Sequence, residues 1–206
     1  MYLLVCRGAK YSYLAMLFFS IPLIMETESV LNIWLTTVPE NTITFVRLSL
    51  ILGMLDCLGR SSFTACLATG KMKRYALILT PVACLEFPLA WLFFFFGAPV
   101  VSCYYVFIVV KTLVLAVRLY LLKDMLGFNP KVFVNNVYLR IFPSTIFALL
   151  LPILIVYLIP PSLFRVIISV VIGVLSVSIS SLYIAMSSHE RNLIVQKVNN
   201  FKKRVL

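Results

Sequence analysis

The stretch that decides the fold covers residues 41–75 and reads NTITFVRLSLILGMLDCLGRSSFTACLATGKMKRY. Its first two-thirds is long and apolar enough for a membrane-spanning helix, because about 20 residues cross the hydrocarbon layer. Arg47, Asp56 and Arg60 are embedded in it, and Gly70 with the basic residues after it ends it. Ionisable groups within a span are costly and are functional by default. The stretch therefore predicts a helix that lines a polar pathway.

The composition of the whole chain indicates that lipid is its main solvent. Of its 206 residues 62% are hydrophobic and 12% are charged, and the mean hydropathy is +1.05. A soluble domain of this size cannot hide that much apolar surface. The apolar runs are continuous rather than alternating, which favours helices over a barrel. The expected fold is an all-α, polytopic integral membrane protein.

The apolar runs predict about six spans, the first of which is kinked at Pro22 and continues past Glu26. We expect them at about residues 11–31, 42–69, 75–96, 100–122, 141–159 and 163–186. An interfacial helix is expected near 129–137 and a basic amphipathic tail over 187–206. Residues 1–10 lack the order of a signal peptide, and we expect them to continue from a longer chain.

The distribution of Lys and Arg predicts the orientation. Basic residues gather in 7–10, 71–74, 123–140 and 191–204, whereas the other side carries acidic residues and only Arg165. The positive-inside rule then places both termini in the cytoplasm. This pattern also accounts for the net charge of +11, so we expect no nucleic-acid partner.

Three ionisable residues on successive spans fall near the middle of the membrane: Asp56, Glu86 and Lys111. Because an unpaired charge at that depth is costly, we expect Lys111 to pair with one of the two acids.

Three arginines extend this layer into a positive stripe, with Arg47 and Arg60 on the same span as Asp56, and Arg118 two turns from Lys111. The candidates for a substrate pathway are Arg47, Asp56, Arg60, Lys111 and Arg118, whereas Glu86 is a candidate for the ion pair alone. The alternative is a set of ion pairs that lock helices together, with arginines that snorkel to the membrane surface.

No catalytic or metal-binding pattern is present. The chain has no phosphate-binding Walker loop, no HExxH and no Gly-x-Ser-x-Gly, and its five cysteines have no paired spacing. We therefore expect neither an enzyme nor a bound metal or other cofactor.

Several short segments carry a family resemblance. Phe19–Leu23 (FSIPL), Val30–Leu35 (VLNIWL) and Ala68–Lys71 (ATGK) occur in the order helix, outer loop, helix and inner turn. With this order the chain resembles bacterial flippases for O-antigen and other lipid-linked oligosaccharides, which are related to multidrug and toxin extrusion transporters. The resemblance covers most of 10–125 and corresponds to the second of the family's two pseudo-symmetric helix bundles.

The resemblance implies a function in export across the bacterial inner membrane by alternating access. It implies that Arg47 and Lys111 face a cationic cavity that attracts a pyrophosphate-linked glycan, and that Asp56 couples transport to H⁺ or Na⁺. Residues 1–126 would be the second bundle, and 127–206 two further spans with the basic tail. The first bundle would come from a missing part of the chain or from a second chain.

Two other functions stay open. The chain could be a non-transporting or inactive membrane subunit that the same ion pairs stabilise, or a multidrug exporter. An exporter of organic cations needs an acidic cavity, and the excess of Arg and Lys in these spans argues against it.

Overall fold

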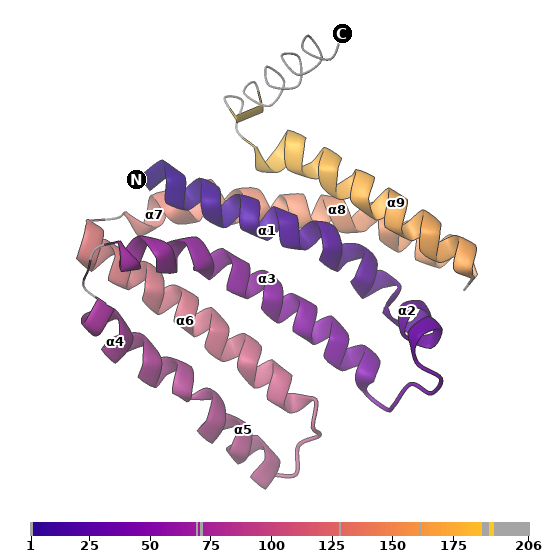
Figure 1. Ribbon diagram of the computed structural model, residues 1–206, viewed down its shortest axis with the longest axis horizontal. Helices are drawn as coiled ribbons and strands as arrows, with labels where there is room; N and C mark the ends of the chain where they lie inside the picture. Colours follow the sequence, from indigo (N-terminus) through magenta and orange to yellow (C-terminus); the bar gives the residue numbers. More distant parts are fainter. Residues whose placement is uncertain are drawn as a thin grey trace.

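Figure 1 shows the computed structural model of the protein. The structure describes residues 2–68, 70, 72–127, 129–160, 162–186 and 190–191. Over these ranges every regular element is helical, and six helical segments are long and apolar enough to cross a membrane. This confirms an all-α polytopic membrane protein. The expected basic tail and Lys71 lie outside the described residues, apart from Glu190 and Arg191.

The helices follow one another in an up-and-down order. They are α1 (Tyr2–Met25), α2 (Thr27–Trp34), α3 (Thr42–Leu67), α4 (Met72–Cys84), α5 (Glu86–Phe95), α6 (Ser102–Leu126), α7 (Pro130–Phe133), the π-helical turn η1 (Val134–Tyr138), α8 (Leu139–Leu158), α9 (Leu163–Ser180) and the π-helical turn η2 (Ser181–Ala185).

The first span differs from the sequence-based expectation at both ends. It begins at Tyr2 instead of near residue 11. Lys10 does not end the helix at the membrane surface, because its side chain is buried and paired with Glu190. It also ends at Met25 instead of continuing through Glu26, and α2 is a separate short helix. The Glu26 side chain is turned into the bundle at this break, where it has a basic partner.

The fifth span also begins earlier than expected. Asn129 caps the Lys131 N–H and Pro130 occupies the first helical position, which is a favourable helix start. From there α7, η1 and α8 form a single span over Pro130–Leu158. The expected separate interfacial helix is therefore wrong, because Phe133 and Val137 are buried in the protein core.

The third span consists of α4 and α5, which are divided at Leu85. Pro88 has no N–H to donate to the carbonyl four residues earlier, that of Cys84, and α4 ends at this residue.

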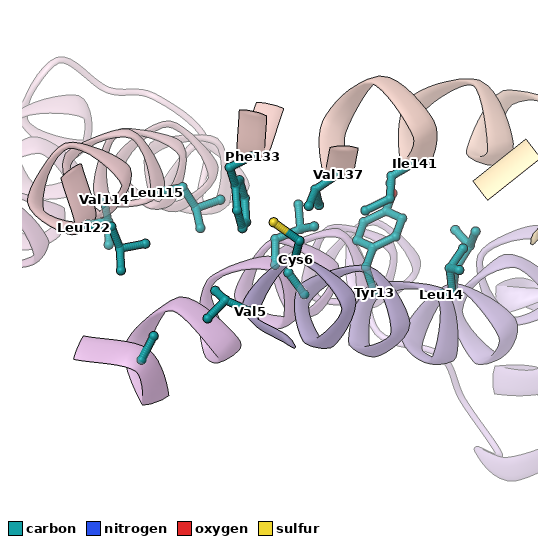
Figure 2. Close-up of a cluster of buried hydrophobic side chains, with 14 of the residues drawn as sticks. Val5, Cys6, Tyr13, Leu14, Val114, Leu115, Leu122, Phe133, Val137 and Ile141 are labelled. Atoms are coloured by element: carbon teal, nitrogen blue, oxygen red, sulfur yellow. The ribbon is translucent and has the colours of Figure 1, made fainter. Parts of the chain in front are cut away.

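In space, α1 is the central helix (Figure 1). It packs on α3 on one side and on α8 and α9 on the other, and the layer continues from α3 through α6 to α4 and α5. In Figure 2, Cys6 and Tyr13 of α1 lie opposite Phe133, Val137 and Ile141, with side chains of α6 beside them. The C-terminal spans therefore cover α1, while α3 and the helices beyond it keep much of their surface outside this core.

The two ends of the bundle differ in charge. The start of α1, the α3–α4 turn and the start of α8 share one end, which we call the basic end. It carries Arg7, Lys73, Lys123 and Arg140, whereas α2 lies at the opposite end with Glu28.

Small residues join α8 to α9 and bring α9 close to α1. The Ser180 hydroxyl donates to the Ser144 carbonyl, and the Ser176 hydroxyl donates to the Ala148 carbonyl at 2.9 Å. A Cβ added at Gly173 would lie 3.1 Å from Cγ of Pro22 in α1. These contacts match the use of small residues between membrane helices.

We expect Gly173→Val to destabilise the protein by about 1–3 kcal/mol, because the added methyl groups overpack the α1–α9 contact. Ser178→Val is the matched control, since among the described residues the Ser178 hydroxyl donates to the Val174 carbonyl of its own helix and to no other helix. Thermal unfolding of the purified proteins in detergent measures the difference. Equal melting temperatures for the two variants would contradict the close packing of α9 on α1.

Candidate functional site

The exposed face of α3 carries a row of polar side chains. Ser49, Asp56, Arg60 and Thr64 are all exposed, and their spacings of seven, four and four residues place them on one face of the helix. The row extends for about 22 Å along the helix axis, which is most of the thickness of a hydrocarbon layer. Together with Lys111 of α6 we call these residues the polar stripe.

An ion pair lies in the middle of the polar stripe. Nζ of Lys111 is 3.3 Å from Oδ1 of Asp56, and the side chains are 35% and 53% exposed. The structure thus joins two of the three groups that the sequence places at mid-depth. The pair is on the molecular surface, and lipid tails cannot solvate charges that are exposed to this extent.

Glu86, the third group expected in this pair, stays outside it. It lies at the start of α5, on the side of α6 that packs against α5, whereas Lys111 is directed from α6 toward α3. Within the described ranges no basic side chain lies within 4.0 Å of the Glu86 carboxylate. The similar depth of the three groups could be predicted from the sequence. The direction in which each side chain points from its helix could not.

Arg60 belongs to the polar stripe and follows Asp56 by one helical turn. It borders an open groove of about 440 Å³ between α1 and α3, together with Ser12, Ser61 and Thr64. Among the residues that the structure describes, no carboxylate lies within 4.0 Å of its guanidinium. Its charge is therefore available to an anion in the groove.

Arg47 lies apart from the polar stripe, since two residues before Ser49 correspond to about 200° around the helix. Its Nε donates a hydrogen bond to the Ile24 carbonyl at 3.1 Å, and this carbonyl belongs to the last turn of α1. A cation at a helix C-terminus satisfies a carbonyl and is favoured by the helix dipole. In this structure Arg47 has a capping role.

Arg118 is also separate from the ion pair. A Cβ built on Gly59 would lie 2.0 Å from its Nη1, so the guanidinium occupies the space that Gly59 leaves between α6 and α3. Arg118 is only partly exposed, and it packs against a helix instead of extending to the membrane surface. The sequence places Arg118 in a positive stripe, but in the structure Arg118 is a packing residue between α6 and α3.

A second, buried ion pair joins the segment between α1 and α2 to the first turn of α9. Nη2 of Arg165 is 3.0 Å from Oε2 of Glu26, and the two residues are 9% and 1% exposed. Ser169 and Ser29 each donate a hydrogen bond to the Glu26 carboxylate at 2.9 Å. One feature of the sequence points to this pair: Arg165 is the only basic residue expected on its side of the membrane.

The ionisation of Glu26 follows from these partners. Burial alone would raise the pKa of the carboxyl group, but hydrogen bonds from Arg165, Ser169 and Ser29, with the arginine charge, outweigh it and lower the pKa. The carboxylate is therefore charged at neutral pH, and its stabilising contribution is lost only as the pH falls through this lowered pKa.

The chemistry of the polar stripe suits binding better than bond-making. It supplies hydroxyl groups, one carboxylate and two cations along a surface. In the described part of the chain no group of three His, Cys, Asp or Glu side chains could hold a metal ion. Comparisons with protein-family models, with curated proteins and with solved structures found no match to this chain.

We expect Glu26→Gln to destabilise the protein by about 3–5 kcal/mol, because it leaves the Arg165 guanidinium buried without its counter-charge. Glu28→Gln is the matched control, since Glu28 is the exposed acid two residues further on. The double variant Glu26→Gln/Arg165→Gln should recover part of the loss. Thermal unfolding in detergent measures all three variants, and equal stability of the two single variants would rule out the buried pair.

Proposed function

We propose that this chain forms one helix bundle of a flippase that moves a lipid-linked saccharide across the bacterial inner membrane. The polar stripe on α3 is its part of the translocation pathway. The observation that carries the proposal is the partly exposed Asp56–Lys111 ion pair, with Arg60 one helical turn from Asp56. The sequence predicts that this pair lies near the middle of the membrane. Such a surface is stable where it lines a water-filled pathway or meets a second polar surface.

The packing supports a second bundle opposite this face. The core of the protein lies between α1, α6 and the C-terminal spans, and the stripe side of α3 is outside it. A facing bundle, from another part of the same protein or from a second chain, would enclose the pathway. Alternating access between two bundles with a midplane site is a common design of secondary transporters.

The charges of the stripe favour an anionic substrate. Two cations against one acid leave a net positive charge, and the guanidinium of Arg60 offers a planar fork that fits phosphate oxygens. In a site with little water such an attraction is screened less than at a surface. We therefore favour a pyrophosphate-linked saccharide as the substrate, with Asp56 as the group that couples transport to H⁺ or Na⁺.

A second candidate function is a non-transporting membrane subunit. The roles of Arg47 as a helix cap and of Arg118 as a packing residue favour it, because both side chains have contacts within the fold. A non-transporting role does not explain why Arg60 is exposed. A multidrug exporter of organic cations fits the net positive stripe poorly.

We expect Arg60→Gln, placed in the chromosomal gene, to reduce surface polysaccharide about tenfold or more at normal protein abundance. The reason is the loss of a charge-assisted contact to phosphate. Arg60→Lys keeps the charge without the fork and should retain part of the activity. Lys73→Gln is the control, because it removes a positive charge at the basic end, away from the stripe.

Surface polysaccharide is quantified by gel electrophoresis of cell envelopes, with the protein level checked by immunoblot. Full polysaccharide in Arg60→Gln cells at normal abundance would leave the non-transporting subunit as the better description.

The orientation proposed from the Lys and Arg asymmetry places the basic end in the cytoplasm. In a variant without native cysteines, Met72→Cys should resist an impermeant thiol reagent added outside, whereas Glu40→Cys should react. Cells with a permeabilised outer membrane are needed, and detergent lysis makes position 72 reactive. Labelling of position 72 before lysis would reverse the proposed orientation.

A further inference from the structure

A second charged cluster lies at the basic end and lines a different pocket from the groove that Arg60 borders. It borders a cavity of about 150 Å³ that is lined by side chains of α1, η1, α8 and the segment after η2. The lining residues are Leu3, Cys6, Arg7, Lys10, Asn136, Arg140 and Glu190. The cluster thus gathers three basic side chains and one acid from α1, α8 and the position of Glu190, and η1 adds Asn136.

Glu190 satisfies only part of this positive charge. Lys10, which is 3% exposed, forms an ion pair with Oε2 of Glu190, and Nε of Arg7 lies 3.2 Å from Oε1. Arg140 has no carboxylate within 4.0 Å among the described residues. Among the described residues that line the cavity, three cations against one acid give a net charge of +2.

The number of hydrogen-bond donors exceeds the number of acceptors in the same way. Each guanidinium carries five N–H donors and the ammonium carries three, whereas the Glu190 carboxylate has two oxygens that Arg7 and Lys10 already contact. Asn136 adds an amide at the wall of the cavity. A phosphate group offers several acceptor oxygens and negative charge, which is the chemistry that this cavity lacks.

We propose that this cavity binds a phosphate group, and that the group is the headgroup phosphate of an anionic lipid. Arg7 is in the second turn of α1. Arg140 is the second residue of α8, whose 20 residues are enough to cross the hydrocarbon layer, so α7 and η1 extend the span beyond it and Arg140 lies near its boundary. Headgroup phosphates of a bilayer lie at that level, and basic pockets between spans are suited to them.

The pocket would also hold Glu190 against α1. Glu190 holds Arg7 and Lys10 in place, and the lipid phosphate would bind Arg140 and the remaining donors of Arg7. This site does not depend on the proposed flippase activity.

The test measures binding of phosphatidylglycerol to the purified full-length chain in neutral detergent, by native mass spectrometry over a lipid titration. Phosphatidylcholine is measured in parallel, because its phosphate is neutralised by the choline group. The variants are Arg140→Gln, Arg140→Lys and, as the control, Lys73→Gln, which removes one charge from the same end without lining the cavity. Size-exclusion chromatography confirms that each variant is folded.

We expect phosphatidylglycerol to bind about tenfold or more tightly than phosphatidylcholine, and Arg140→Gln to remove about the same factor. Arg140→Lys should fall between, and Lys73→Gln should match the wild type. Equal affinity for the two lipids, or the same loss in Lys73→Gln as in Arg140→Gln, would overturn the site.

Inorganic phosphate added to the titration separates the two sources of the group. If it does not displace phosphatidylglycerol, the site is specific for a lipid-borne phosphate. Tighter binding of inorganic phosphate than of phosphatidylglycerol, with the phosphate binding lost in Arg140→Gln, would keep the phosphate site but assign it to a soluble phosphate, and so overturn its assignment to lipid.

Discussion

A charged side chain in a helical membrane bundle needs either an opposite charge that is buried with it or contact with water, and the arrangement of this protein depends on this constraint. The pair of Glu26 and Arg165 meets it by burial, with two serine hydroxyls that complete the carboxylate's hydrogen bonds. Asp56 and Lys111 also form an ion pair, but the pair is not buried, because both side chains stay partly exposed. The difference between the two pairs separates a structural ion pair from a surface that needs water or a protein partner.

The same constraint explains how the helices are distributed. Glu26 connects the end of α1 to α9, and Gly173 lets α9 approach Pro22 closely, so the C-terminal spans cover one side of α1. This leaves the polar side of α3 uncovered, and the exposed Arg60 lies there. Within the described chain, the part that is packed most tightly is thus opposite the part that we propose for transport.

Much of the fold could be predicted from the sequence, because long apolar runs have few alternatives in a membrane. The depth of a residue could also be predicted by counting residues along its span. This placed Asp56 and Lys111 at a similar depth, and the structure pairs them. The direction of a side chain around its helix depends on which neighbours the helix packs against, and no apolar run encodes it. For this reason the capping role of Arg47, the contact of Arg118 with Gly59 and the burial of Glu26 could not be foreseen.

Carboxylate labelling in native membranes tests the central claim most directly, that the stripe is in contact with water while the buried pair is sealed. A water-soluble carbodiimide with a small amine modifies accessible carboxylates, and mass spectrometry of the digested protein reads each site without any mutation. The account predicts that Asp56 reacts at a rate close to that of the exposed Glu28, whereas Glu26 is protected. Protection of Asp56 to the same degree as Glu26 would contradict it.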